Sequence, residues 1–192
     1  MTGAFRKDLA RRLFGKSTGA KIATILLSSE LHCVACYRFG RWARSLRRRI
    51  GLLALPALVV HRVWNRWCTH MHHCEIDPRA QIGPGLLIMH RTGIIIGPVV
   101  VGSNLTLHQN VTIGLRVAQG ERTVPTIGNR VWIGPMATIS GGITVGDRVT
   151  ISAAAVLSKD IPDGCLVAGN PARVIARDYD SSPMMRSAGT EE

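Results

Sequence analysis

Acidic residues are almost missing from the first third of the chain. Residues 1–70 contain fourteen Lys and Arg side chains but only two acids, Asp8 and Glu30, whereas residues 71–192 contain ten basic and ten acidic side chains. The net charge of +12 over 192 residues therefore belongs to the N-terminal part. This division predicts two physically different units, a basic segment over 1–70 and a second domain from residue 71 onward.

Aromatic residues are also scarce, at 5% of the chain, while there are 20 glycines. A helical bundle with a bulky aromatic core does not fit this composition, whereas a repetitive β architecture does. Apolar residues make up 46% and charged residues 19%, which excludes wholesale disorder.

Targeting and membrane-spanning signals are missing as well. The longest apolar run, residues 51–60, is well short of the roughly 20 residues that cross a bilayer. The basic start MTGAFRKDLARRLFGK leads into no apolar core with a cleavage site, so no secretory signal is expected. The cysteines are odd in number and irregularly spaced, so no disulfide framework is predicted and we expect a cytoplasmic protein. They are Cys33, Cys36, Cys68, Cys74 and Cys165.

Two cysteine-containing segments could be interpreted as chemical sites. The pair Cys33-x-x-Cys36 lies in a helical pattern with no second pair, which favours small buried residues over a redox site. The segment CTHMHHC, residues 68–74, is a candidate metal site, but no second ligand group follows at zinc-site spacing. We therefore predict no metal.

The basic segment has helical periodicity. Phe39, Trp42 and Leu46 recur at i, i+3 and i+7 and predict an apolar helix face within residues 20–49. A second helix is predicted over 52–68, kinked at its proline.

Arginines on the other face of the first helix allow three interpretations. Arg41, Arg44 and Arg48 either form a solvated helix face or rest on an anionic membrane surface as part of a basic amphipathic helix. Nucleic-acid binding is disfavoured, because neither a recognised motif nor interleaved stacking aromatics accompany the charge. The membrane interpretation would add peripheral contact with the inner face of the cell membrane.

From about residue 75 the apolar residues recur with a period of six instead of a helical period. An aliphatic residue recurs every sixth position, often with a glycine after it, and the windows are rich in β-branched residues, which rejects a helix. Each six-residue unit is a short strand plus a turn, and stacked units bury their repeated residues in one continuous interior. The series are Ile76, Ile82, Ile88 and Ile94; Val101, Leu107 and Ile113; and Ile127, Ile133, Ile139, Val145, Ile151 and Leu157.

Repeats such as IGPGLL, IGNRVW, IGPMAT and VGDRVT resemble the hexapeptide acyltransferases. The resemblance covers roughly residues 70–176 and implies a mainly β fold, a left-handed parallel β-helix with three hexads per coil, which assembles as a homotrimer. An extra residue between Ile94 and Val101 and a loop at 115–126 interrupt the hexads. The closing segment LSKDIPDGCLVAGNPARVI, residues 157–175, resembles that of acetyl-CoA-dependent members. Residues 177–192 are expected to form a loose tail.

His90 is the predicted catalytic base. A neutral imidazole can take a proton from an acceptor hydroxyl as it attacks a thioester and return it to the departing thiolate. Glu75, fifteen residues earlier, would orient the imidazole from the neighbouring coil. The segment EIDPRAQIGPGLLIMHRTGIIIG closely resembles the serine acetyltransferase family, which usually has Asp where Glu75 stands.

His108 is the second candidate base, and a substrate-lining role is equally open for His108 or Gln109. Cys165 is not expected to carry an acyl group, because no His or Lys adjoins it and the nearby Asp163 disfavours a thiolate. Direct transfer is therefore predicted.

The resemblance also implies where acetyl-CoA binds. Pro135 and Ala153 match family positions that line the pantetheine cleft, and Lys159 and Arg173 match basic positions near the nucleotide phosphates. Gly169, in AGNPAR, supplies a tight backbone turn.

The acceptor is predicted from positions at which this chain departs from the serine acetyltransferase pattern. Serine-using enzymes place Asp where Met89 stands and an Arg-His pair where Thr123 and Val124 precede Pro125. Losing these charged contacts weakens serine binding, since each is worth on the order of 1.5–3 kcal/mol. A colanic-acid type of acetyltransferase, with short basic helices before a similar core, is the closer resemblance. We therefore expect O-acetylation of a sugar of a surface polysaccharide or its lipid-linked precursor.

Three alternatives stay open. The first is serine O-acetylation, and the second is a non-catalytic scaffold that keeps the fold without activity. The third is a metalloenzyme of the carbonic anhydrase kind, which needs three histidines, whereas only His90 and His108 lie within the repeats.

Overall fold

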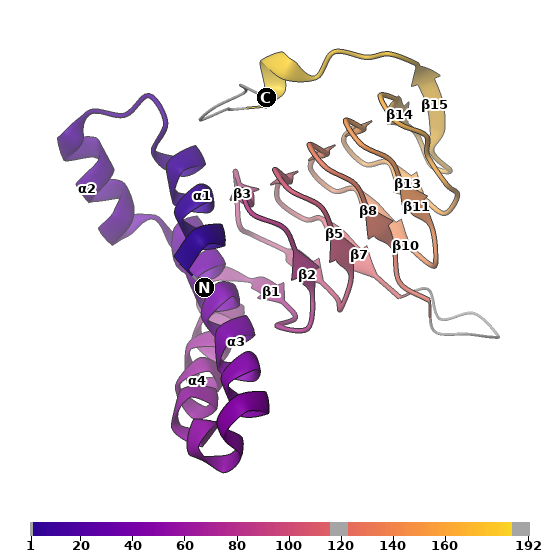
Figure 1. The fold of residues 1–192 in the computed structure, drawn as a ribbon. Coiled ribbons are helices and arrows are strands. Elements are labelled where there is room, and N and C mark those ends of the chain that lie inside the picture. Colours follow the sequence, from indigo (N-terminus) through magenta and orange to yellow (C-terminus); the bar gives the residue numbers. More distant parts are fainter. Residues whose placement is uncertain (1, 116–122, 186–192) are drawn as a thin grey trace.

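The computed structural model describes residues 2–115 and 123–185. A group of helices precedes a stack of short strands that winds into a prism (Figure 1). The helices are α1 (Thr2–Leu13), α2 (Thr18–Leu27), α3 (Ser29–Ile50) and α4 (Leu55–His72), with the 3₁₀ turns η1 (Gly51–Ala54) and η2 (Ser182–Met184).

The predicted first helix is divided in two. Ser28 has an extended backbone between α2 and α3, and its side chain caps α3 by accepting a hydrogen bond from the Leu31 N–H at 3.3 Å. Gly51, with φ 58°, ends α3 after an arginine-rich last turn. The kink expected at Pro56 is wrong, because Pro56 lies in the first turn of α4, where a helix needs no N–H from it.

Only part of the predicted apolar face of α3 is buried. The Phe39 ring packs at a tilt against Trp42 and Trp64, with centroid distances of 5.3 and 5.9 Å, but Trp42 itself is 37% exposed. The side of α3 that packs on the first coil carries Val34 and Tyr37 instead. The prediction missed this side because the helix has two neighbours, α4 and the β-helix, rather than one.

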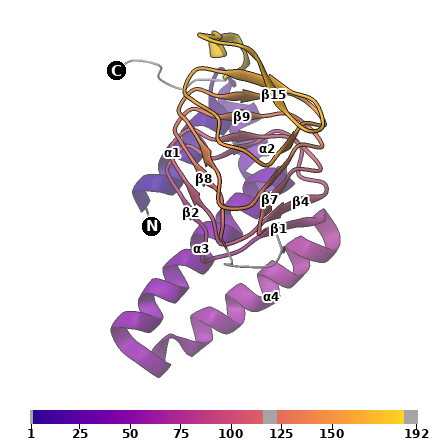
Figure 2. The same ribbon diagram turned by 90° about the vertical axis from the view of Figure 1, so that its right-hand side faces the viewer.

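The strands form three parallel sheets, one on each side of a left-handed β-helix (Figure 2). The predicted fold class is therefore confirmed. The first face contains β1 (Cys74–Ile76), β4 (Ile94–Ile96), β7 (Thr112–Gly114), β10 (Thr138–Ser140) and β13 (Val156–Leu157). The second contains β2 (Gln81–Ile82), β5 (Val100–Val101), β8 (Thr126–Ile127) and β11 (Thr144–Val145). The third contains β3 (Leu87–Ile88), β6 (Thr106–Leu107), β9 (Trp132–Ile133), β12 (Thr150–Ile151), β14 (Leu166–Ala168) and the antiparallel β15 (Arg173–Ala176).

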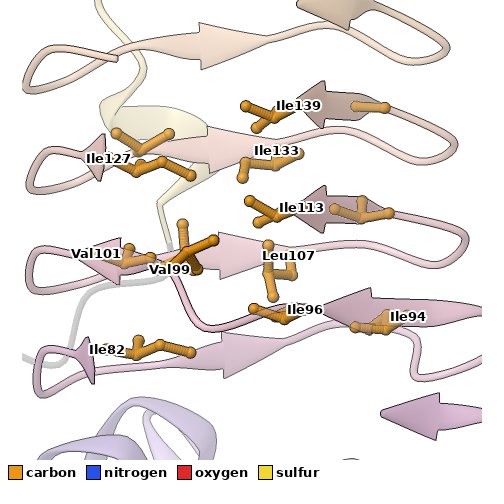
Figure 3. Close-up of a cluster of buried hydrophobic side chains, with 14 of the residues drawn as sticks. Ile82, Ile94, Ile96, Val99, Val101, Leu107, Ile113, Ile127, Ile133 and Ile139 are labelled. Carbon is orange, nitrogen blue, oxygen red and sulfur yellow. The ribbon is translucent and has the colours of Figure 1, made fainter. Parts of the chain in front are cut away.

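The repeated aliphatic residues stack in columns inside the prism (Figure 3). Ile133 pairs with Ile151, eighteen residues later, as three periods of six predict. One assignment is wrong: Ile96, not Ile94, stands in the column between Ile76 and Ile113. Two extra residues therefore enter the chain between β3 and β4, and they enlarge the turn that follows β3.

Two buried side chains fasten the helices to the first coil. The Arg38 guanidinium pairs with the Asp8 carboxylate, with Nε to Oδ2 at 2.7 Å, and also donates to the carbonyls of Ile82 and Gly83 at 2.6 and 2.7 Å. The Tyr37 hydroxyl donates to the Ala80 carbonyl and accepts from the Ile82 N–H. Buried polar groups need such partners, so these bonds set how the helices sit against the β-helix.

The segment expected to be a loose tail is packed over its described part. Beyond β15 the chain runs back along the prism (Figure 1), and Ser181 and Met185 are buried. The Met185 sulfur accepts a hydrogen bond from the Thr106 hydroxyl at 3.7 Å. Residues 186–192, the rest of the expected tail, lie outside the described residues.

Candidate active site

The candidate residues gather along one corner of the prism, where the chain turns from the third face to the first. We call this edge the histidine corner; it consists of the turns 89–93, 108–110, 134–136, 152–154 and 168–170. Backbone hydrogen bonds stack these turns. His108 N–H donates to Ile133 O at 3.2 Å, Gly134 N–H to Ile151 O at 2.8 Å, and Ser152 N–H to Val167 O at 2.9 Å.

His90 lies on the enlarged turn and is exposed. Its ring centroid is 6.1 Å from that of His108 on the next coil, and His108 in turn lies 4.9 Å from the ring of Trp132. Desolvation lowers the pKa of His108, and the nearby His90 lowers it further, because two cationic imidazoles would repel each other. The corner therefore holds a neutral imidazole beside an exposed one, which is a suitable arrangement for proton transfer.

Glu75 lies close to this corner but does not contact His90 through a polar bond. It is exposed on β1, paired with Ile95 of β4, and two residues before it the His73 carbonyl accepts from the Gly93 N–H at 2.7 Å. Within residues 2–115 and 123–185, neither Glu75 nor His90 forms a side-chain hydrogen bond or ion pair. The orienting role of Glu75 stays a prediction.

Glu30 supplies a carboxylate beside the turn that carries His90, and no role was predicted for it. Its oxygens lie 2.9 Å from an Arg12 nitrogen and 3.8 Å from a nitrogen of Arg91, the neighbour of His90. Burial opposes ionisation of Glu30, but backbone and Ser28 hydrogen bonds, together with the two arginines, lower its pKa overall. One signal was available: Glu30 and Asp8 are the only acids in the basic segment, and both form ion pairs with arginine.

Three of the predicted cofactor residues share the histidine corner. Ala154 N–H donates to Pro135 O and Val156 N–H to Gly169 O, so Pro135, Ala153 and Gly169 lie on successive coils. Arg173 pairs with Ala168 and reaches the same end of the prism. Lys159 is exposed at the neighbouring corner, after β13, and so is separated from the others by the width of the first face.

Gln109 lies on the histidine corner between the levels of His90 and Pro135. Its backbone carbonyl accepts from the Met136 N–H at 3.0 Å, while its Oε1 is buried without a hydrogen-bond partner in the described residues. A buried acceptor without a partner is costly. Gln109 is therefore suited to receive a hydrogen bond from a bound molecule.

The cysteines are all free and buried. Cys33 and Cys36 of α3 lie against Cys68 of α4, where both thiols contact its sulfur. The predicted burial of the C-x-x-C pair is confirmed, and the preference for packing over a redox site stays a prediction. Among the described residues, no group of three or more His, Cys, Asp or Glu side chains is arranged to hold a metal ion.

The stacked six-residue coils and the residues on one corner define a hexapeptide-repeat transferase. A model of the family "Bacterial transferase hexapeptide (six repeats)" matches residues 125–159. A serine acetyltransferase from Helicobacter pylori is 34% identical over 124 residues, which cover 64% of this chain and 67% of that protein. The chain therefore belongs to the hexapeptide-repeat acetyltransferases, within the serine acetyltransferase-like group, and its reaction is acetyl-CoA-dependent O-acetyl transfer.

Solved structures of serine acetyltransferases resemble this chain over most of its length. The serine acetyltransferase of Brucella abortus in complex with coenzyme A is 26% identical, with a TM-score of 0.75 and coverage of 91% of this chain and 67% of that one. The serine acetyltransferase of Neisseria gonorrhoeae in complex with serine is 26% identical, with a TM-score of 0.74 and coverage of 90% and 68%. Both likenesses extend beyond the β-helix into the helices, since each covers nine-tenths of the chain.

Proposed function

We propose that this enzyme transfers acetyl directly from acetyl-CoA to an acceptor hydroxyl, with His90 as general base. The observation that carries the proposal is that His90 and His108, with Trp132 beside them on β9, lie on the same corner as the predicted cofactor residues. His90 takes the hydroxyl proton as the oxygen attacks the thioester carbonyl. The carbon–sulfur bond then breaks, and the imidazolium returns the proton to the thiolate, which leaves an acetyl ester and free coenzyme A.

Acetyl-CoA would lie along the histidine corner. The exposed or half-buried Pro135, Ala153 and Gly169 leave room for a slender pantetheine arm, because their side chains are small. Arg173, and Lys159 at the neighbouring corner, would interact with the phosphates by charge. The complex of the Brucella relative with coenzyme A supports the choice of donor.

Three residues would complete the acceptor side. Glu75 would orient His90 and stabilise its transient cation from β1. His108, whose pKa is lowered, would stay neutral and line the acceptor pocket together with the unpartnered Gln109 oxygen. A neutral side chain here avoids repulsion with the imidazolium that forms on His90.

L-Serine is the acceptor that the comparisons favour, in place of the surface-glycan sugar expected from the sequence, because the similar curated and solved proteins are serine acetyltransferases. A sugar hydroxyl is the second candidate, and local chemistry favours it. Met89 and Thr123 offer no charge for an amino acid's ammonium and carboxylate. Each missing charge-assisted contact would raise the serine KM by roughly 10- to 150-fold.

The deciding experiment measures thiol release from acetyl-CoA with L-serine, nucleotide sugars and lipid-linked oligosaccharide in parallel. Saturable serine turnover supports serine O-acetylation, whereas turnover with sugars alone supports the second candidate. A matched Met89→Asp variant should lower the serine KM if serine is the acceptor. No transfer to any acceptor, together with no acetyl-CoA binding by calorimetry, would contradict both and favour a scaffold.

We further propose a homotrimer in a reducing compartment, the cytoplasm. Support for assembly comes from Ile95 and Leu115, large apolar side chains exposed on the coils that carry the histidines. Support for the compartment comes from the free thiols of all five cysteines. Sedimentation equilibrium tests the assembly: a trimer mass is expected, and a monomer across the micromolar range would contradict it.

A further inference from the structure

The α3–η1–α4 hairpin forms an arm that projects from the first end of the prism (Figures 1 and 2). The base of the arm is packed on the first coil through Tyr37 and Arg38. Its tip, η1, lies far from that contact. The arm therefore presents surface that the fold of this chain does not use.

Large apolar side chains cover the outside of this arm. Leu52 and Leu53 at the tip are 68% and 80% exposed. Along α4, exposed apolar residues recur every fourth position and therefore share one side of the helix. These are Val59, Val63, Trp67 and Met71. Exposed apolar surface of this extent marks a binding surface rather than a solvated face.

The charge around this surface has one sign. Residues 31–74 contain eight arginines and no aspartate or glutamate. Arg47, Arg48 and Arg49 are exposed directly before the tip, and Arg62 and Arg66 are exposed on α4. Arg38 alone of the eight forms an ion pair, with Asp8, in the described part of the chain. Arg41 donates to the Tyr37 hydroxyl, and Arg44 is close enough to Asp77 to lower its pKa. The exposed arginines of the α3 end and of α4 are available to an anionic partner.

A groove between α3 and α4 combines apolar side chains with positive charge. It has a volume of about 470 Å³ and is lined by Arg44 and Arg62 together with Leu55, Leu58 and Val59. Two guanidinium groups at an apolar cleft match a phosphate that is attached to an acyl chain. The groove therefore offers charge for a phosphate and apolar surface for an acyl chain.

We propose that the arm docks on an anionic lipid bilayer, with the η1 tip and the outer side of α4 in the interface and the arginines on the phosphates. Basic residues with Trp and Leu on the apolar side are the composition of interfacial helices. A second copy of the chain fits less well, because a symmetric contact would bring the same unneutralised arginines together. The docking does not rest on the proposed acetyl transfer.

The geometry indicates surface attachment rather than a membrane span. No single helix of the described residues has the length and apolar character to cross a bilayer. One bent pair, Thr18–Leu27 with Ser29–His72, qualifies by length and composition only, across a 62° bend. The pair includes α3, whose inner side is buried on the first coil.

Flotation of the full-length protein with vesicles tests the proposal. Vesicles of phosphatidylcholine with about 30% phosphatidylglycerol should bind the protein at 0.1 M salt, and binding should fall steeply at 0.5 M salt, where charge is screened. Pure phosphatidylcholine vesicles should bind it at least about tenfold more weakly. Trp67 fluorescence should be quenched by brominated acyl chains, with Trp67→Phe as the control for the other tryptophans.

Two sets of variants separate the contributions. Leu52→Ser/Leu53→Ser should reduce binding by about tenfold or more, whereas Ile175→Ser, at a residue 60% exposed on β15, should not change it. Arg47→Gln/Arg48→Gln/Arg49→Gln should reduce binding by roughly 100-fold. The control variant Arg148→Gln/Arg177→Gln, which removes two exposed arginines from the other end of the prism, should have no effect. Circular dichroism confirms that each variant is folded.

Several outcomes would overturn the proposal. One is absence of flotation with anionic vesicles at low salt, and another is equal binding to neutral vesicles. Binding to duplex DNA without binding to vesicles would identify a nucleic-acid surface instead. Self-association that Leu52→Ser/Leu53→Ser abolishes, without vesicle binding, would identify a second copy as the partner.

Discussion

Replacing Arg38 with methionine should destabilise the junction between the helices and the first coil. Arg38 and Asp8 are 6% and 1% exposed, so neither charge is solvated in the folded state. The guanidinium makes two hydrogen bonds to the Asp8 carboxylate, at 2.7 and 3.0 Å, and two to the carbonyls of Ile82 and Gly83. Methionine keeps most of the apolar stem but supplies no donor.

The expected loss of stability follows from the buried carboxylate that remains after Arg38 is replaced. In Arg38→Met the Asp8 carboxylate remains buried without its direct ion-pair partner; the N–H groups of Gly85 and Leu86 still donate to it at 2.7 and 2.8 Å, and Arg11 interacts with it by charge. Removing one partner of a buried ion pair costs about 3–5 kcal/mol. For a chain of this size that corresponds to a fall of roughly 6–20 °C in Tm.

Urea unfolding followed by circular dichroism, with thermal melts in parallel, measures the loss. Arg48→Met is the matched control, since Arg48 is exposed on the same helix, and it should change stability by less than about 0.5 kcal/mol. Adding Asp8→Asn to Arg38→Met removes the stranded charge while keeping an acceptor for the two N–H groups, so the double variant should be more stable than Arg38→Met alone. A loss below about 1 kcal/mol in Arg38→Met, or no recovery in the double variant, would refute the reasoning.

The remaining predictions concern the site and the core. His90→Ala should lower turnover in the thiol-release assay by about 10²–10⁴, and turnover near the wild-type value would assign the base to His108 instead. The pKa values of His61 and His108 are lowered by burial, so the unfolded chain binds more protons near and below pH 6.5 and stability should fall as pH drops from 7 to 5. His61→Gln should make that decline in the urea midpoint shallower, and an unchanged slope would contradict the assignment. Gly134→Ala would place a Cβ 2.8 Å from the Ala153 nitrogen and 2.9 Å from the Ile151 oxygen, so it should lower both Tm and acetyl-CoA affinity by calorimetry; wild-type values for both would count against the cofactor path.

The architecture was predictable because its signals are local. A period of six in β-branched residues is incompatible with a helix and places each aliphatic residue in the interior, as Ile133 and Ile151 demonstrate. Pro135 and Ala153 are eighteen residues apart, three periods of six, and lie on one corner because residues one coil apart return to the same face. Gly169, sixteen residues after Ala153, departs from this spacing, and only the family resemblance indicated it. The exception, Ile96 in place of Ile94, arose where a turn length changes, and periodicity carries no information about a turn that breaks it.

Contacts between separate parts of the chain were not predictable in this way. Asp8 and Arg38 are thirty residues apart, and nothing in their spacing indicates that both meet the first coil. Glu30 reaches the turn of His90 only because α3 packs at the start of the prism. Likewise, the apolar pattern of α3 does not indicate which of its two sides faces the β-helix.

The amino-acid sequence by itself determined the repeated strand-and-turn unit, the division of charge and the shared corner of the histidines, since these depend on composition and spacing along the chain; its resemblance to the hexapeptide acyltransferases implied the three-sided coil. Only the tertiary structure decided which carboxylate neighbours which arginine, that His108 lies between His90 and Trp132, and that the outer side of α4 is left uncovered. The physical reason is that burial and electrostatic interaction depend on distances through space, and those are set by how the helices and coils pack together.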